Sequence, residues 1–133
     1  MLPILLYTTK RIFKHYTGFS FFIFILISKL EKDETRLIRH ETIHFWQQAE
    51  LLFIFHWLLY VIFYLISRLK GHSHYIAYRY NPFELEAYKH DADALYLKKR
   101  KPLAWLFYVN EYLITLRKDC SNPNLKNKKI DWK

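Results

Sequence analysis

The stretch that decides the fold is residues 39–67, "RHETIHFWQQAELLFIFHWLLYVIFYLIS", in which a polar motif leads directly into an apolar segment. The first part contains the pattern HExxH, made by His40, Glu41 and His44. Residues four apart share one face of a helix, so both imidazoles can bind a single metal ion, and Glu41 lies at the edge of that face. A shuffled chain of this composition would contain the pattern in roughly one case in fifty, which makes chance the weaker explanation.

A long helix is predicted from residue 34 to 70 around this stretch. Asp33 is a suitable N-cap, and no proline or glycine follows until Gly71. Such a helix would be about 57 Å long, whereas a compact domain of this length measures roughly 36 Å across. The apolar segment 49–67 is therefore expected to span a bilayer, to bend, to lie at a membrane interface, or to pack against the last helix or another subunit.

The segments before the long helix predict a short antiparallel hairpin or small sheet. Residues 7–17 are mixed and tolerate a strand, Gly18 interrupts the pattern, and a second strand is expected at about 19–27. After the long helix, residues 71–80 are interpreted as a loop or extended chain.

Two further helices are predicted in the C-terminal half. Asn81 and Pro82 form a cap and a first-turn proline for a helix that continues to Arg100, and another helix begins at Pro102. The predicted fold class is thus mainly α (α+β), as a single domain over residues 1–133 with the apolar helical segment at 49–67.

Composition and charge restrict the partners. Hydrophobic residues make up 52% of the chain and aromatic residues 20%, which is more apolar surface than a small globule hides easily. The net charge of +9, with basic clusters at 98–101 and after Leu116, fits an anionic membrane surface, although the tail is interpreted as a solvated surface that keeps the protein soluble. The same positive charge would attract the phosphates of nucleic acid. No motif that reads bases or binds phosphate is present, however, so no nucleic-acid partner is predicted.

The single cysteine and the N-terminal residues bear on the environment of the chain. Cys120 has no second cysteine to pair with, so stability is expected to come from packing or a metal ion. Residues 1–10 lack the features of a secretory signal, which predicts association with the cytoplasmic side of a membrane, or else a cytoplasmic location.

Two segments resemble the zinc metallopeptidases of the gluzincin type. "LIRHETIHFW" at 37–46 is similar to their extended HExxH pattern, and "NPFELEAY" at 81–88 is similar to the segment, often ExEAD, that supplies their third ligand. In this match Glu84 is the ligand and Ala87 the small residue that lets two helices approach. Tyr88 replaces the family's aspartate, which would orient a ligand histidine. The resemblance covers residues 18–101 and implies a minimal zincin-like core.

The resemblance also implies the chemistry. Zn²⁺ would be held by His40, His44 and Glu84 with water as the fourth ligand, and Glu41 would be the catalytic base acting on a peptide or protein substrate. Glu86 is the alternative third ligand, on another helix face. The strand at 19–27 is the candidate for pairing with extended substrate, or else a buried core strand.

Weaker candidates could orient a ligand or stabilise a developing oxyanion. They are Gln47, Tyr80, Tyr88 and His90, together with the "DAD" at 91–93. His90 and residues 91–93 could equally form an exposed helix face.

The sequence thus predicts a small zinc-dependent hydrolase, a metallopeptidase, close to a membrane surface. A site using Glu84 and a straight single span at 49–67 largely exclude one another, because residues 71–84 would have to return through hydrocarbon. Two alternatives stay open: a non-catalytic membrane-associated protein with a structural metal site, and a membrane-spanning protein with a fortuitous HExxH. Association of copies through the apolar helix is a further expectation.

Overall fold

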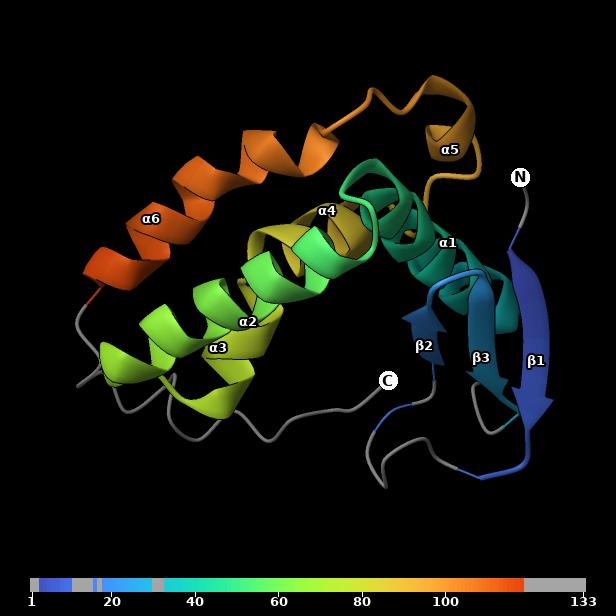
Figure 1. The fold of residues 1–133 in the computed structure, drawn as a ribbon, viewed down its shortest axis with the longest axis horizontal. Coiled ribbons are helices and arrows are strands. Elements are labelled where there is room, and N and C mark those ends of the chain that lie inside the picture. The colour runs from blue at the N-terminus through green and yellow to red at the C-terminus, as the bar shows by residue number, and fades with distance from the viewer. Residues whose placement is uncertain (1–2, 11–15, 17, 30–32, 119–133) are drawn as a thin grey trace.

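A small sheet and a set of helices make up the computed structural model in Figure 1, which describes residues 3–10, 16, 18–29 and 33–118. The basic tail beyond residue 118, including Cys120, lies outside these residues. The elements in chain order are β1 (Ile4–Thr8), β2 (Gly18–Phe21), β3 (Phe24–Ser28), α1 (Glu34–Glu50), α2 (Ile54–Leu69), α3 (His74–Arg79), α4 (Pro82–His90), α5 (Tyr96–Lys99), the 3₁₀ helix η1 (Ala104–Tyr108) and α6 (Val109–Arg117). The prediction of a mainly helical α+β chain is confirmed.

The sheet is mixed, with the strand order β1-β3-β2. Strand β3 pairs with β1 in parallel and with β2 antiparallel. The prediction of a purely antiparallel sheet is therefore wrong, and so is the single strand at 19–27. That segment is instead a tight hairpin, in which Phe21 pairs with Phe24 and the chain turns at Phe22 and Ile23.

The hairpin turn is held by a side chain of α1. The backbone N–H of Phe22 donates to Oε1 of Gln48 at 3.1 Å, and Nε2 of Gln48 donates to the carbonyl of Ser20 at 3.0 Å. Phe22 has a φ of 53°, a region that aromatic residues rarely adopt. No glycine or asparagine marks this turn, so local sequence rules do not reveal it.

One face of the sheet packs against α1. Ile25 and Ile27 alternate along β3 and are fully buried against Phe45 of α1, with Leu37 and Ile38 partly buried at the edge of the cluster. Alternate residues of β3 and residues on one face of α1 thus form one small core. This contact fixes the sheet beside the HExxH helix.

The chain bends between α1 and α2 by 111°, which is one of the alternatives expected for the segment 49–67, so the predicted continuous helix over 34–70 is wrong. Leu52 and Phe53 have φ values of 53° and 60°, and the N–H of Phe53 donates to the carbonyl of Gln48 at 2.6 Å. A positive φ costs a non-glycine residue roughly 1–3 kcal/mol, so tertiary packing must offset the bend.

That packing is an aromatic cluster between α2 and α4. The ring of Phe83 in α4 lies 4.4 Å from His56 and 6.1 Å from Phe63 of α2, between ring centroids. Trp105 of η1 lies 4.7 Å from Phe83 on another side. Helix α6 runs alongside α2 in Figure 1, where the hydroxyl of Tyr112 donates to the carbonyl of Phe63 at 2.7 Å. The inner face of α2 is therefore directed toward α4.

Three other boundaries differ from the predictions. Residues 74–79, expected as a loop, form α3, whose N-cap Ser73 accepts from the N–H of Ile76. The helix that begins at Pro82 ends at His90, and only a short turn, α5, follows. The last helix begins at Ala104 as η1 and becomes α-helical at Val109.

None of the helices in the described residues is long and apolar enough by itself to cross a bilayer. Helices α1 and α2 together, across their bend, meet the same criteria of length and composition.

Candidate metal centre

Helix α1 presents the three residues of HExxH to the interior of the molecule. Asp33 caps the helix by accepting from the N–H of Arg36 at 3.0 Å, which sets the helical register of the residues that follow. His40, Glu41 and His44 are between 6% and 7% exposed. Three ionisable side chains are thus buried together, which requires a compensating partner.

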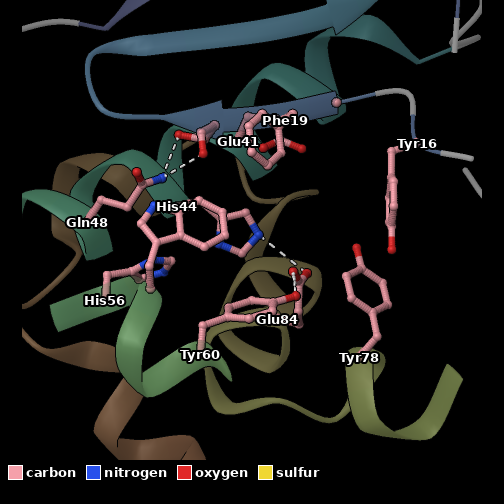
Figure 2. A pocket seen from close by; sticks show the side chains of 12 residues that line it. Tyr16, Phe19, Glu41, His44, Gln48, His56, Tyr60, Tyr78 and Glu84 are labelled. Atoms are coloured by element: carbon pink, nitrogen blue, oxygen red, sulfur yellow. Dashed lines mark hydrogen bonds and ion pairs between the residues drawn. The ribbon is translucent and has the colours of Figure 1, made fainter. Parts of the chain in front are cut away.

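A cavity of about 200 Å³ adjoins these side chains (Figure 2). Two of the HExxH residues line it, together with strand β2 and residues of α2, α3 and α4. The lining residues are Tyr16, Gly18, Phe19, Ser20, Glu41, His44, Gln48, His56, Trp57, Tyr60, Tyr78 and Glu84. Polar groups with metal-binding or proton-transfer chemistry therefore lie in a cavity with largely aromatic walls.

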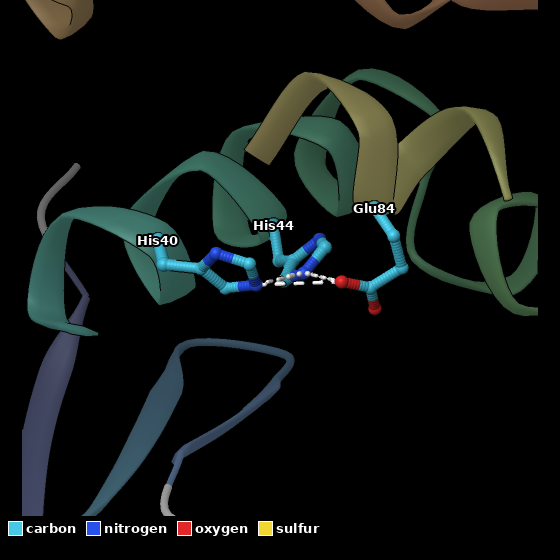
Figure 3. Close-up of side chains that lie close together, drawn as sticks. All are labelled: His40, His44 and Glu84. Carbon is cyan, nitrogen blue, oxygen red and sulfur yellow. Dashed lines mark hydrogen bonds and ion pairs between the residues drawn. The ribbon is translucent and has the colours of Figure 1, made fainter. Parts of the chain in front are cut away.

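Helix α4 brings Glu84 to the two histidines, as Figure 3 shows. Asn81 caps α4 and Pro82 occupies its first turn, so the helix begins where the sequence predicted. Oε2 of Glu84 lies 3.4 Å from Nε2 of His40 and 3.3 Å from Nε2 of His44. The two Nε2 atoms are 3.2 Å apart. These three residues form a buried group that could hold a metal ion.

The close approach of α4 to α1 depends on a small residue. Ala87 is fully buried against Ile43 of α1, and Tyr96 completes this cluster. A larger side chain at Ala87 would push the helix carrying Glu84 away from the histidines. The role that the resemblance implied for Ala87 therefore has a matching contact in the structure.

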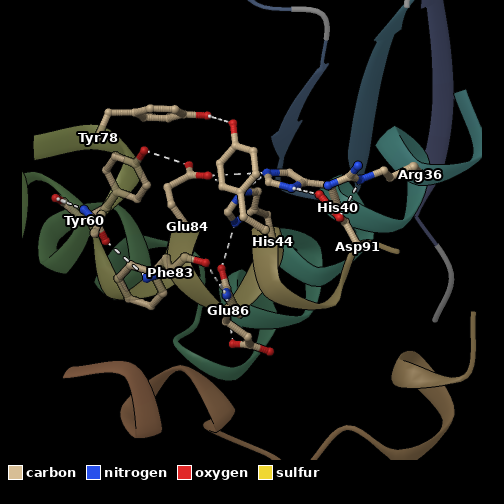
Figure 4. Close-up of polar contacts among 12 residues, drawn as sticks. Arg36, His40, His44, Tyr60, Tyr78, Phe83, Glu84, Glu86 and Asp91 are labelled. Carbon is tan, nitrogen blue, oxygen red and sulfur yellow. Dashed lines mark hydrogen bonds and ion pairs between the residues drawn. The ribbon is translucent and has the colours of Figure 1, made fainter. Parts of the chain in front are cut away.

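Hydrogen bonds orient both imidazoles toward the same point (Figure 4). Nδ1 of His40 lies 3.2 Å from Oδ2 of Asp91, and Nδ1 of His44 lies 2.8 Å from Oε1 of Gln47. Both acceptors place a proton on Nδ1, so Nε2 is the nitrogen of each ring that is directed toward Glu84. Gln47 is fixed in turn, because its Nε2 donates to the carbonyl of Phe83 at 3.0 Å.

A carboxylate orients His40 although position 88 holds a tyrosine. The acceptor is Asp91, which caps the C-terminus of α4 one turn further along and also accepts from Nε of Arg36 at 2.7 Å. Tyr88 packs its ring 4.4 Å from that of His40, between centroids, and its hydroxyl lies 3.1 Å from that of Tyr78. From the sequence, Asp91 is only one of several weak candidates for orienting a ligand, as part of the "DAD" at 91–93.

Glu84 is held through one oxygen only. Its Oε1 accepts from the hydroxyl of Tyr60 at 2.8 Å, whereas its buried Oε2, which faces the histidines, has no hydrogen-bond partner. A buried carboxylate oxygen without a hydrogen bond is costly unless positive charge faces it, which either a metal ion or the protonated imidazoles at 3.3 and 3.4 Å would supply. Sequence reasoning missed Tyr60, since nothing local distinguishes it from the other aromatic residues of α2.

The electrostatics of the group favour positive charge at its centre. Burial opposes charging of His40, but the hydrogen bond with Asp91 and the nearby Glu84 carboxylate outweigh it and raise the pKa of His40 to about 10. Burial likewise opposes ionisation of Glu84, yet the attraction of His44 and contacts with both imidazoles hold the pKa of Glu84 well below its usual range. A bound cation would replace the protons that this arrangement attracts.

Glu41 lies at the cavity wall, confined by β2. Burial raises the pKa of the Glu41 carboxyl, against the opposing effect of His40 and His44. A methyl group added at Gly18 would lie 2.4 Å from Oε1 of Glu41 and 2.6 Å from Cδ1 of Leu37, which is closer than such atoms approach. The strand can therefore pack against the carboxylate only because residue 18 is glycine.

His56 is a further polar side chain of the cavity. It is 2% exposed, and neither ring nitrogen has a hydrogen-bond partner among the described residues. Burial, together with the nearby His44, lowers the pKa of His56 to about 3, so that the imidazole is neutral at physiological pH. Its ring centroid is 6.5 Å from that of His44.

Glu86 points away from the histidines into a separate network. Its carboxylate accepts from the hydroxyl of Tyr96 at 3.0 Å, from Nε2 of Gln47 at 2.9 Å and from the guanidinium of Arg100. Arg100 also pairs with Glu50 of α1. Of the two glutamates considered as third ligand, the structure brings Glu84 to the HExxH residues and engages Glu86 elsewhere.

The two remaining weak candidates lie away from the histidine pair. Tyr80 forms the C-cap of α3 and does not line the cavity. His90 stacks on Tyr96 with 3.8 Å between ring centroids, and its Nε2 contacts the hydroxyl of Tyr108.

Comparison with models of protein families, with curated proteins and with solved structures gives no match for this chain. The chemistry of the site must therefore be argued from the geometry of its own residues.

Proposed function

We propose that this protein is a zinc-dependent peptidase with a minimal zincin-like core of the gluzincin type. The proposal depends on one observation, the set of distances among the three candidate ligand atoms. Zinc bound tetrahedrally at about 2.0–2.1 Å from each ligand requires ligand atoms roughly 3.3–3.4 Å apart. The observed separations are 3.2, 3.3 and 3.4 Å.

The composition of the ligand set supports a catalytic site over a structural one. Structural zinc sites are closed by four protein ligands, whereas catalytic sites commonly have three and leave one position open. Here two histidines and Glu84 supply three ligands, and the cavity that also contains Glu41 adjoins them. When bound, zinc would act as a Lewis acid and lower the pKa of a water molecule to about 7.

The chain's own residues account for the proton transfers of peptide hydrolysis. Glu41 removes a proton from the attacking water as its oxygen bonds to the carbonyl carbon of the peptide. The proton then passes to the amide nitrogen as the C–N bond breaks, which yields a carboxylate and an amine. A carboxylate in this position can both accept a proton from water and release it to the leaving amine.

Strand β2 and the aromatic walls are suited to a peptide. β2 is an edge strand of the sheet, and Gly18, Phe19 and Ser20 line the cavity. An extended peptide could add to such an edge by main-chain hydrogen bonds. The cavity of about 200 Å³ exceeds the roughly 150 Å³ that accommodates a benzene ring, so one large apolar side chain of the substrate would fit.

Metal content tests the ligand set. We expect the purified protein to contain one zinc ion per chain and Glu84→Gln to lose it, because a neutral amide is a poor zinc ligand. Glu86→Gln is the matched control and should retain the ion, since that carboxylate pairs with Arg100. Atomic emission on both variants measures this. Loss of zinc from the Glu86 variant alone would reject the assignment.

Peptide cleavage tests the reaction. A library of peptides analysed by mass spectrometry should show cleavage that a chelator abolishes and added zinc restores. A zinc-loaded protein that cleaves no peptide, and that unfolds on chelation, would instead have a structural metal site.

The orienting carboxylate gives a second prediction. Asp91→Asn removes the charged acceptor of His40, and such a loss typically weakens zinc binding about 10- to 100-fold. The control is Asp93→Asn, which removes only an exposed pair with Lys99. Competition with a chromophoric chelator gives the zinc dissociation constant of each variant. Equal constants for the two would show that Asp91 does not support the ligand.

A further inference from the structure

The outward face of α2 is apolar over its whole length. The side chains on it are between 39% and 86% exposed, namely Ile54, Phe55, Leu58, Val61, Ile62, Leu65, Ile66 and Leu69. At 100° per residue they cover an arc of about 140°. The opposite side of the same helix carries His56 and Tyr60 into the cavity. No element in the described part of the chain covers the outward arc.

The tip of the β2–β3 hairpin extends this surface. Phe21 and Phe22 of the hairpin are 45% and 43% exposed, and Leu52, in the bend between α1 and α2, is 70% exposed. The ring of Phe22 stacks on that of Phe53, with 5.1 Å between centroids, just before α2 begins. The eight residues of the α2 arc and these three exposed residues together are called the apolar face below. A continuous exposed surface of this kind marks an interaction site.

The charged side chains of the segment between Glu50 and Glu84, which contains α2, have one sign. No acidic residue occurs between Glu50 and Glu84, whereas Arg68, Lys70 and Arg79 fall within this interval. Arg68 and Lys70 are exposed at the C-terminal end of α2. An anionic surface would attract these groups, and no carboxylate of this segment would oppose the contact.

We propose that the apolar face binds the surface of an anionic phospholipid membrane, with α2 lying in the plane of the interface. A helix with a broad apolar arc, aromatic residues and basic residues at its border has the character of an interfacial helix. A helix that pairs with a second copy of itself as a coiled coil uses a narrower stripe flanked by charges of both signs. The breadth of the arc and the missing acidic partners therefore favour lipid over a second copy.

Membrane binding would have a consequence for the cavity. Because the inner side of α2 lines the cavity and its outer side would contact lipid, the cavity would lie about one helix diameter, roughly 10 Å, from the membrane surface. If the proposed peptidase function holds, its substrates would be segments that lie at or emerge from the bilayer. The lipid contact itself does not depend on that function.

Vesicle sedimentation tests the proposal with the full chain. We expect the protein to bind vesicles of phosphatidylcholine containing a minority of phosphatidylglycerol more tightly than pure phosphatidylcholine, and added salt to reduce the difference. Leu58→Glu should lower the partition coefficient at least about tenfold, since it removes an apolar group and adds a negative charge. Leu95→Glu is the matched control, because Leu95 is 59% exposed and Leu58 54%, and Leu95 lies outside the apolar face.

Two outcomes would overturn the proposal. One is an unchanged partition coefficient in Leu58→Glu, provided that its thermal unfolding matches that of the control. The other is a lipid-free protein that is dimeric in sedimentation equilibrium and becomes monomeric on the same substitution, which would assign the apolar face to a second copy. Neither outcome bears on zinc content, so failure here is distinguishable from failure of the peptidase proposal.

Discussion

Replacing Glu41 by glutamine is expected to lower kcat/KM for peptide hydrolysis about 10²- to 10⁴-fold while zinc is retained. Glutamine has the shape of glutamate but cannot accept a proton at neutral pH. The proposed ligands His40, His44 and Glu84 are untouched, and within the described residues no hydrogen bond joins Glu41 to them. The substitution therefore removes proton transfer and leaves metal binding intact.

The measurement uses a peptide that the unmodified protein cleaves. Initial rates give kcat/KM, and atomic emission gives zinc per chain. Glu34→Gln is the control, because Glu34 is exposed in the first turn of the same helix and does not line the cavity. Undiminished hydrolysis by the Glu41 variant would show that another group takes the proton. Loss of zinc would show instead that Glu41 contributes to the ligand set.

Replacing Arg100 by methionine is expected to lower the free energy of unfolding by about 3–5 kcal/mol. The side chain of Arg100 is 5% exposed and pairs with Glu50 of α1 and Glu86 of α4. Nη2 of Arg100 lies 3.3 Å from Oε2 of Glu50 and 3.2 Å from Oε2 of Glu86. Without the guanidinium, a fully buried carboxylate and a largely buried one would remain uncompensated.

Urea unfolding of the two proteins measures this loss. Lys99→Met provides the control, since Lys99 and Asp93 form an exposed pair with side chains 61% and 36% accessible. Such a pair contributes less than about 1 kcal/mol. If both substitutions lowered the free energy of unfolding by the same amount within about 1 kcal/mol, the ion pairs of Arg100 with α1 and α4 would not stabilise the fold more than an exposed pair does.

The Arg100 network also bears on why Glu86 is not near the histidines. Sequence spacing places Glu84 and Glu86 on different faces of one helix, but it does not state which face meets α1. On one side of α4, Glu86 is bound by Arg100, Tyr96 and Gln47. On another side of the same helix, Glu84 is bound by Tyr60. Selection between the two carboxylates is thus made by residues from three other segments.

The sequence by itself determined the features that follow from local geometry. His40 and His44 share a face because a helix turns once in 3.6 residues, whatever surrounds it. Asp33 and the pair Asn81 and Pro82 began their helices as predicted, since capping involves only neighbouring backbone groups. The resemblance to gluzincins pointed to Glu84, and the structure places that residue opposite the histidines.

The tertiary structure alone decided the bend after Glu50, the hairpin turn at Phe22 and the support of His40 by Asp91. At Leu52, Phe53 and Phe22 the backbone adopts a conformation that local preference opposes, because contacts from distant segments outweigh that cost. Asp91 reaches His40 across 51 residues of sequence, through the packing of α4 on α1. Such contacts depend on the sum of many distant interactions, whereas a helical face depends only on the spacing of neighbours.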